Sequence, residues 1–327
     1  MATLLLPVLA ILLGFALLIW SADKFVLGAS NTARNFSISP LVVGIVIVGL
    51  GTSAPEMLVS SMAALENKTG LSIGNALGSN ITNIGLMLGL TAIFYPLQIH
   101  SKILKREMPV LLATMLLTLF LLWDQYLGFI DGVILISLLF AMLAYMVYEA
   151  KRHNKGDVPQ EILDEMPEEV SKKSAIVWLI VGMALLIAAS RILVWGAVEV
   201  AQFFNVSDLI IGLTIVAIGT SLPELATTLA AARKKEFDLA VGNIIGSNIF
   251  NLLAVVSLAG LIRPSHFDRV VLTRDFPVMF ALTVTLLLFS IAWKKGKTGT
   301  LGRLEGCLLL LGYISYMFWL YKDMTAL

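Results

Sequence analysis

Residues 44–83 recur 168 positions later as residues 212–251, and this duplication constrains the fold more than any other feature of the chain. Eighteen of the forty aligned positions are identical, without a gap. Both copies lie in stretches long enough to cross a bilayer, where polar groups are costly, so the duplicated motif predicts a site. The identities are mainly glycine, proline and oxygen-bearing residues: Gly51/Gly219, Thr52/Thr220, Ser53/Ser221, Pro55/Pro223, Glu56/Glu224, Gly74/Gly242, Asn75/Asn243, Gly78/Gly246, Ser79/Ser247, Asn80/Asn248 and Asn83/Asn251.

The composition predicts an all-α integral membrane protein. Hydrophobic residues make up 58% of the chain and charged residues only 14%, whereas soluble domains have about 45–50% and about 25%. A membrane helix needs roughly 20 mainly apolar residues. Ten segments meet that length, near residues 3–21, 40–65, 71–97, 108–123, 128–148, 175–196, 207–232, 239–262, 276–293 and 302–321.

The duplication divides the chain into two five-helix halves, residues 1–148 and 174–327, joined by an acidic linker at 149–173. Five is odd, so the second half starts on the opposite side of the membrane and the repeat is inverted, as in many secondary transporters. Fewer residues match at the same offset outside the motif. Gly28 matches Gly196, and Arg106-Glu107-x-Pro-Val matches Arg274-Asp275-x-Pro-Val.

Charge counting predicts the orientation in the cell membrane. Seventeen of the 23 Lys and Arg residues lie in loops on one side or at the very edge of such a loop, and this side should be cytoplasmic. Both termini are then outside, and the linker is cytoplasmic.

The net charge of +1 gives no indication of nucleic-acid binding, and the single Cys307 rules out a disulfide framework. No protein partner is indicated.

Glu56 and Glu224 each lie deep in a predicted membrane helix. A carboxylate near the centre of such a helix costs about 2.5–3.5 kcal/mol. The simplest structural explanation is an acid that is protonated or paired with a basic residue. However, no Lys or Arg lies in the interior of the four repeat helices. We therefore expect both acids to belong to an ion site.

Pro55 and Pro223 directly precede the two glutamates. A proline within a helix provides no N–H for the carbonyl four residues earlier, and its ring opens the preceding turn. Carbonyls at 49–52 and 217–220 should therefore be available beside the carboxylates. Such backbone is tolerated at membrane depth only next to protein or a watery cavity.

Every side-chain atom in the motifs that could bind a metal cation is an oxygen, because no Cys or His is present. Hard cations prefer such sites, and Ca²⁺ accepts six to eight flexible oxygens more readily than Mg²⁺ does. One Ca²⁺ or two Na⁺ would neutralise two carboxylates, which is an electrostatic basis for exchange. Spacings of three and four residues place the polar side chains on shared helix faces: Thr52, Ser53 and Glu56; Asn75, Ser79 and Asn83; and their counterparts in the second copy.

Gly-Thr-Ser-x-Pro-Glu followed by Gly-Asn-x-x-Gly-Ser-Asn, present twice, resembles the calcium/cation antiporter superfamily, and especially its prokaryotic sodium/calcium exchangers. The resemblance implies that the first and sixth helices, Leu4–Ser21 and Ala175–Gly196, slide across a binding core. Some relatives carry Asp where Asn251 stands, so potassium co-transport is not expected. The resemblance also implies ligands: Glu56, Glu224 and the carbonyls of Thr52 and Thr220 for Ca²⁺; Ser53, Ser221, Ser79, Ser247 and the carbonyls of Gly49 and Ala217 for Na⁺; and Asn83 and Asn251 at the remaining position.

Four functions fit a membrane protein with such a motif. The first is a Na⁺/Ca²⁺ antiporter, and the second is a Ca²⁺/H⁺ or other cation/H⁺ antiporter in which the two acids carry protons. A cation channel fits less well, because an inverted repeat suits alternating access better than a pore of symmetric subunits. An enzyme fits least, because no nucleophile and base accompany the acids. We expect no cofactor, only the transported Ca²⁺ and Na⁺.

Overall fold

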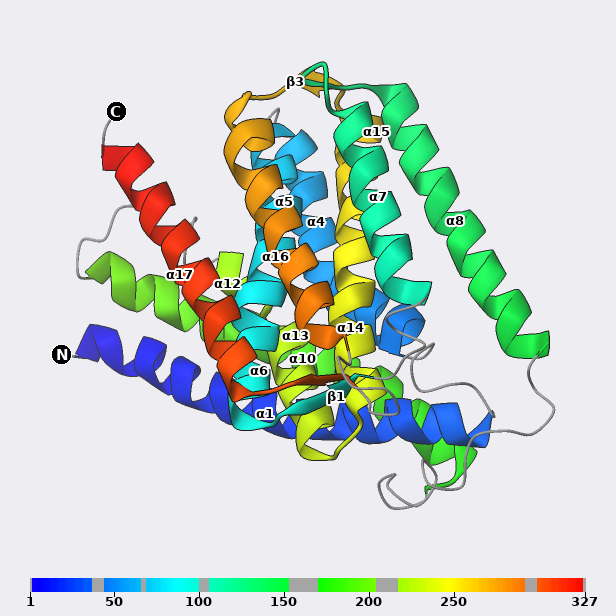
Figure 1. Cartoon of the computed structure of the whole chain (residues 1–327). Coiled ribbons are helices and arrows are strands. Elements are labelled where there is room, and N and C mark those ends of the chain that lie inside the picture. The colour runs from blue at the N-terminus through cyan, green and yellow to red at the C-terminus, as the bar shows by residue number, and fades with distance from the viewer. Residues whose placement is uncertain are drawn as a thin grey trace. The chain divides into compact units, whose positions relative to one another are not determined.

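The computed structural model describes residues 2–36, 44–65, 69–99, 106–152, 170–203, 217–291 and 299–325, and these are mainly helical (Figure 1). The α-helices are α1 (Ala2–Asn35), α3 (Leu50–Thr52), α4 (Ala54–Leu65), α5 (Thr69–Thr82), α6 (Gly89–Phe94), α7 (Met108–Leu121), α8 (Phe129–Arg152), α10 (Lys172–Phe203), α12 (Ala217–Thr220), α13 (Leu222–Arg233), α14 (Phe237–Phe250), α15 (Val256–Ile262), α16 (Phe276–Ser290) and α17 (Arg303–Thr325). The π-helical segments are η1 (Gly44–Gly49), η2 (Asn83–Leu88), η5 (Asn251–Val255) and η6 (Val271–Asp275).

Seven helical stretches in the described part of the chain are long and apolar enough to cross a membrane. They are Leu4–Thr32, Ser72–Phe94, Phe129–Met146, Lys172–Ala197, Phe237–Ile262, Val271–Ser290 and Arg303–Asp323. The predicted span 108–123 corresponds to α7, a shorter apolar helix of 14 residues. The predicted spans 40–65 and 207–232 lie partly outside the described residues. The all-helical membrane architecture is therefore confirmed, and the count of ten stays a prediction.

The chain forms two compact units, and each takes residues from both halves of the sequence. The first unit contains Met1–Pro55 and Met146–Asn243, and the second contains Glu56–Tyr145 and Ile244–Leu327. The division into repeats 1–148 and 174–327 concerns the duplication and stays a prediction. Most of the linker 149–173 lies outside the described residues.

In the first unit, α1 and α10 lie side by side (Figure 1) and are joined at glycines. A Cβ atom on Gly14 would lie 2.9 Å from the Leu193 nitrogen, and one on Gly182 would lie 2.8 Å from the Phe25 Cα. Gly14 and Gly182 are 168 positions apart in the sequence, and so are their partners, Phe25 and Leu193. Glycine is therefore required here for close approach of the backbones, as is common between membrane helices.

The other two glycines of this interface repeat the relation. Gly28 of α1 contacts Leu179, and Gly196 of α10 contacts Pro7, Ala10 and Ile11 of α1. Gly14 meets residue 193 and Gly28 meets residue 179, so α1 and α10 run antiparallel. The Gly28/Gly196 echo in the sequence thus corresponds to a reciprocal packing contact.

The first helix is longer than the sequence predicts. The expected end at residue 21 precedes the charged Asp23 and Lys24, yet α1 continues to Asn35. The physical reason is tertiary, because Arg233 at the end of α13 binds both carboxylate oxygens of Asp23 at 2.6 Å. A paired charge no longer requires the helix to end at the membrane surface.

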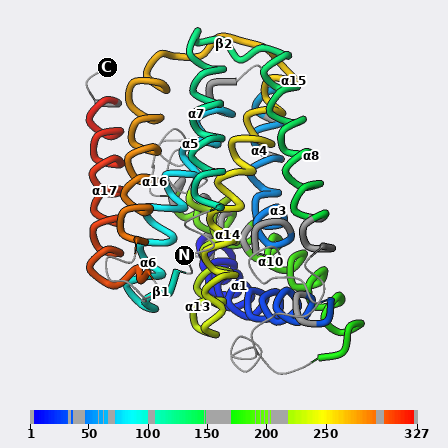
Figure 2. The backbone as a smooth tube through the Cα atoms, turned by 45° about the vertical axis from the view of Figure 1, so that its right-hand side comes forward, coloured from blue at the N-terminus to red at the C-terminus, as the bar shows by residue number. Residues whose placement is uncertain are grey.

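The second unit holds two antiparallel strand pairs, each joining the two halves of the sequence. Strand β1 (Leu97–Ile99) pairs with β4 (Gly299–Leu301), and β2 (Tyr126–Leu127) pairs with β3 (Ser265–His266). Figure 2 shows α16 and α17 beside each other, and α17 also packs against α6. These contacts bring the helices after the two motifs into one core.

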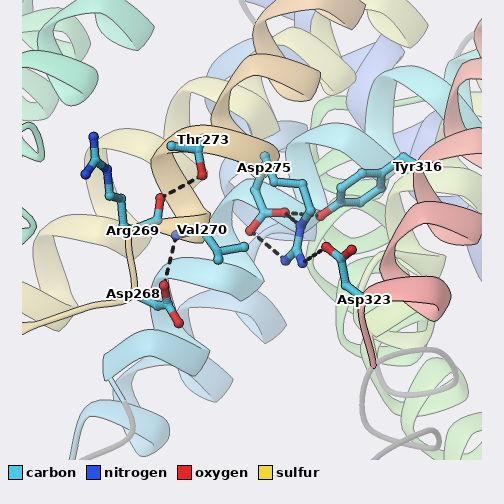
Figure 3. Close-up of polar contacts among 8 residues, drawn as sticks. Asp268, Arg269, Val270, Thr273, Asp275, Tyr316 and Asp323 are labelled. Carbon is cyan, nitrogen blue, oxygen red and sulfur yellow. Dashed lines mark hydrogen bonds and ion pairs between the residues drawn. The ribbon is translucent and has the colours of Figure 1, made fainter. Parts of the chain in front are cut away.

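Charged residues at the start of α16 are paired with one another (Figure 3). Arg274 binds Asp275 at 2.8 Å and Asp323 at 3.0 Å, and the Tyr316 hydroxyl donates to Asp275 at 2.8 Å. In the first copy, Arg106 lies 3.6 Å from Glu107. The charges of this second repeated element are therefore paired at the start of α7 and of α16, which gives the element a structural explanation.

Candidate ion site

Both copies of Gly-Thr-Ser-x-Pro-Glu form an interrupted helix. Helix α3 ends at Thr52, and Ser53 leaves helical geometry with φ −80° and ψ 2° before α4 begins. Helix α12 ends at Thr220, and Ser221 adopts φ −91° and ψ 6° before α13 begins. Each helix is therefore interrupted just before its proline, as expected, and the availability of the nearby carbonyls to an ion stays a prediction.

The side chains singled out by the sequence are buried almost without exception. Glu56 and Glu224 are each 1% exposed, although a carboxylate is among the costliest groups to bury. Thr220 is partly exposed, and Ala217, of which only the backbone is described, is the first residue of α12. The fully or nearly fully buried members are Gly49, Thr52, Ser53, Ser221, Ser79, Ser247, Asn83 and Asn251.

The first unit brings the two motif copies into direct contact. The Ser53 hydroxyl donates to Glu224 Oε1 at 3.3 Å. The Thr52 hydroxyl donates to Asn243 Oδ1 at 3.1 Å and has the Gly49 carbonyl at 3.4 Å. That carbonyl also accepts the Ser53 N–H at 3.1 Å. Residues 52 and 53 of the first copy therefore lie against residues 224 and 243 of the second.

Asn243 holds the two helices of its own motif together. Its Nδ2 donates to the Glu224 carbonyl at 3.3 Å and to the Thr228 hydroxyl at 2.9 Å. Because Glu224 follows the helix interruption, this amide fixes the backbone that carries the acid. The side chain of Asn243 thus contacts both copies of the motif.

The second unit contains the matching arrangement from the first copy. Asn75 Nδ2 donates to the Ser60 hydroxyl at 2.9 Å and to the Glu56 carbonyl at 3.4 Å. Ser60 occupies the position equivalent to Thr228. Both copies therefore anchor the backbone of their glutamate in the same way.

Four asparagines form a reciprocal network in the second unit. Asn83 Nδ2 donates to Asn248 Oδ1 at 3.1 Å, and Asn251 Nδ2 donates to Asn80 Oδ1 at 3.0 Å. Asn80 Nδ2 donates to the Asn248 carbonyl at 3.1 Å. The Oδ1 atoms of Asn83 and Asn251 are buried and have no hydrogen-bond partner among the described residues.

A π-helix starts at each of these two ligand candidates. η2 begins at Asn83 and η5 begins at Asn251. Single π turns within α-helices occur often at functional sites, because the wider turn changes the direction of a side chain. The structure thus repeats, at the 168-residue offset, both the polar side chains and the local backbone that carries them.

Sequence reasoning placed Asn75 and Asn243 on the polar face of the site without assigning them a role, and it missed two pairs of residues that hold the site: Asn80/Asn248 and Ser60/Thr228. Asn75, Asn80 and their counterparts were visible as identities in the repeat, so their recurrence was the available signal. Ser60 and Thr228 differ, and only the shared hydroxyl links them. Which groups they bind depends on the packing of the helices.

Comparisons with known proteins agree with the motif. The family model described as "Sodium/calcium exchanger protein" matches residues 6–148 and 174–322. CaxA from Alkalimonas amylolytica is 48% identical, covering 96% of this chain and 98% of that protein. The inner membrane protein YrbG of Escherichia coli is 40% identical, covering 95% of each chain.

Solved structures show the same relation in three dimensions. A structure of the sodium-calcium exchanger NCX_Mj, soaked with Na⁺ and Sr²⁺, matches with a TM-score of 0.82 and 33% identity. The match covers 96% of this chain and 98% of that one. The duplicated oxygen-rich motif, the membrane helices and the match over both halves lead to one assignment: the chain belongs to the sodium/calcium exchanger family of membrane antiporters.

Proposed function

We propose that the chain is a secondary active antiporter that exchanges Ca²⁺ for Na⁺. The observation that carries the proposal is a repeated set of buried oxygen donors with one carboxylate in each copy. Glu56 and Glu224 are each 1% exposed, and an asparagine amide of the same motif donates to the backbone carbonyl of each. Buried carboxylates at membrane depth are expensive and are usually functional.

The charge of the set favours exchange between these two ions. Two carboxylates balance one Ca²⁺ or two Na⁺, so one set of ligands can serve both ions in turn. A third Na⁺ would add a positive charge and make transport depend on the membrane potential. Oxygen ligands alone are what hard cations prefer.

The expected ligands keep the roles that the resemblance implies. Glu56 and Glu224, with the carbonyls of Thr52 and Thr220, would bind Ca²⁺. The buried hydroxyls Ser53, Ser79, Ser221 and Ser247, with the carbonyls of Gly49 and Ala217, would bind Na⁺. Asn83 and Asn251 would supply amide oxygens, and this role is supported by the Oδ1 atom of each, which has no hydrogen-bond partner in the part of the chain that the structure describes.

The membrane arrangement follows from the repeat. Two inverted five-helix halves would place the ions near the midplane, and alternating access would expose them to each side. The excess of Lys and Arg in one set of loops supports a cytoplasmic linker with both termini outside. The name of the related inner membrane protein YrbG supports the same membrane for this chain.

The test is ⁴⁵Ca²⁺ uptake into proteoliposomes loaded with Na⁺ and diluted into sodium-free or sodium-equal buffer at constant pH. Uptake that requires the outward Na⁺ gradient supports the proposal. Uptake driven by a pH gradient in the absence of Na⁺ would replace it with Ca²⁺/H⁺ exchange. Ca²⁺ flux without stimulation by either counter-ion would indicate a channel.

The variants Glu56→Gln and Glu224→Gln should abolish this uptake. The matched control is Glu107→Gln, which also removes a buried acid, but one outside the motif. Burial raises the pKa of Glu107, despite the opposing effect of Arg106, so glutamine is a close replacement there. Full transport by either motif variant would overturn the shared carboxylate site.

A further inference from the structure

We propose that Asn80 and Asn248 are positioning residues that fix the amide orientation of Asn251 and Asn83, so that each presents Oδ1 to a bound cation. The inference rests on the proposed function, because it concerns how two of its ligands are aimed. It extends that function to residues that do not themselves face the ion. The structure supports it through one network of buried hydrogen bonds.

The chemistry of asparagine makes orientation decisive. One end of the amide is an acceptor oxygen and the other is an NH₂ donor. A rotation of 180° about the last side-chain bond exchanges the two ends without changing the shape. A cation is bound by the oxygen and repelled by the NH₂ group. A ligand asparagine therefore needs a partner that selects the correct end.

Asn80 and Asn248 supply that selection. Asn251 Nδ2 donates to Asn80 Oδ1 at 3.0 Å, and Asn83 Nδ2 donates to Asn248 Oδ1 at 3.1 Å. An amide oxygen only accepts hydrogen bonds, so each bond requires the NH₂ end. The opposite ends, the Oδ1 atoms of Asn83 and Asn251, are buried and have no hydrogen-bond partner among the described residues.

The orientation of Asn80 is itself fixed. Its Nδ2 donates to the Asn248 carbonyl at 3.1 Å, with Met279 Sδ at 3.5 Å. If Asn80 turned, its NH₂ group would face that of Asn251 and both bonds would be lost. All four asparagines are 1% exposed, so bulk water does not replace these partners.

The network crosses between the two halves of the sequence. Asn80 of the first copy orients Asn251 of the second, and Asn248 of the second copy orients Asn83 of the first. Each ligand is therefore aimed only when the two copies are packed together. This arrangement resembles metal sites, where groups behind a ligand set its orientation and affect affinity by roughly 10–100-fold.

The experiment measures Ca²⁺ affinity by equilibrium ⁴⁵Ca²⁺ binding to purified protein, with ⁴⁵Ca²⁺ transport in proteoliposomes alongside. Asn80→Leu removes the acceptor at similar size and should weaken binding by roughly 10–100-fold. The control is Thr91→Val, which removes a buried hydroxyl that donates only to its own helix at Met87. That control should bind as the wild type does.

Rescue separates orientation from simple packing. Asn251→Asp gives residue 251 an oxygen at both ends, so its orientation no longer matters. In that background, Asn80→Leu should weaken binding far less than in the wild type. Asn83→Asp should rescue Asn248→Leu in the same way. If Asn80→Leu does not fold, two other tests remain. Asn80→Asp keeps an acceptor oxygen for Asn251, and Asn248→Leu can be compared with and without Asn83→Asp.

Each outcome decides one point. Unchanged affinity in Asn80→Leu, with normal wild-type binding, overturns the positioning role and leaves Na⁺/Ca²⁺ exchange intact. A loss of equal size in the Asn251→Asp background assigns Asn80 to packing alone and also overturns it. A folded wild type that neither binds Ca²⁺ nor transports it overturns the proposed function, and this inference with it.

Discussion

The α1–α10 pair and the polar helices of the motifs follow the same repeat but are built in opposite ways. The apolar stretches that contain α5 and α14 are 72% and 89% buried, whereas those of α1 and α10 are 28% and 18% buried. Directional hydrogen bonds join the motif helices, and glycine contacts join α1 to α10. Hydrogen bonds fix a register, whereas close backbone contacts define a surface without requiring specific polar partners.

This difference gives a physical basis for the expectation that the first and sixth helices slide. Because the α1–α10 contacts at Gly14, Gly28, Gly182 and Gly196 are reciprocal, the two helices are suited to move as one body. Val170, just before α10, is tied to the end of α1, since its N–H donates to Asn31 and its carbonyl accepts from Asn35. The polar motifs should stay rigid during such a movement.

The largest expected effect separates function from stability in the motif. Glu224→Gln should reduce Ca²⁺ flux by more than about 100-fold, since unit charges about 4 Å apart attract by about 4 kcal/mol at an intermediate dielectric. The Ser53 hydroxyl retains an oxygen to bind, and a costly buried charge is removed. Thermal unfolding in detergent should show an unchanged or higher Tm. A clear fall in Tm would instead give Glu224 a structural role.

The next effect tests the glycine interface. Gly28→Leu or Gly182→Leu should lower stability by about 1–3 kcal/mol through overpacking, because each Cβ would meet the backbone of the partner helix. Transport should slow while the affinity for Ca²⁺, measured by equilibrium binding, stays near that of the wild type. Gly74→Ala is the control, since no described atom lies within 4 Å of its Cβ position.

Altered Ca²⁺ affinity in the Gly28 variant would contradict the distinction between the α1–α10 pair and the polar motif helices. It would show that the α1–α10 contact and the ion ligands are not separate parts. A Gly74→Ala variant as unstable as Gly28→Leu would show that any side chain at a membrane glycine is harmful, and the specific contact would then explain nothing.

A smaller effect tests whether the two motif copies are equivalent in energy. Thr228→Val and Ser60→Ala each remove an acceptor from an asparagine amide, that of the buried Asn243 or of the partly buried Asn75. Each should lower the free energy of unfolding by about 0.5–1.5 kcal/mol, the usual net contribution of one hydrogen bond, because the amide still donates to the carbonyl of its glutamate. Chemical denaturation in detergent would compare them. An effect confined to one copy would show that the structural repeat is not an energetic one.

The sequence predicted the membrane class, the family and the burial of the motif because these depend on composition and on residue identity. A glutamate that follows Gly-Thr-Ser-x-Pro within an apolar stretch already indicates a site. Glu56 and Glu224 could be chosen for this reason, and Asn83 and Asn251 through the resemblance to the family, before any packing was known. Their relation to the ligands of a cation stays a prediction.

The features of the fold and the site that the sequence did not predict depend on contacts between distant residues. No local pattern marks Asn83 and Asn251 as the start of π-helices, because the residues around them suit an α-helix equally well. Asp23, which lies beyond the predicted end of the first helix, is paired with Arg233, which is 210 positions away. Asn80 likewise binds Asn248, and Asn243 binds Thr52, in each case a residue of the opposite copy of the motif.

The smallest expected effect concerns the ion pair that joins α1 to α13. Arg233 binds Asp23 at 2.6 Å, but their side chains are 49% and 29% exposed, so solvent screens the attraction. A double-mutant cycle with Asp23→Asn and Arg233→Gln should give a coupling of about 0.2–1 kcal/mol in thermal or chemical unfolding. A pair this weak can hold α1 in one position and still be broken during each transport cycle. A coupling of several kcal/mol would make it a permanent joint, and α1 could then slide only together with α13.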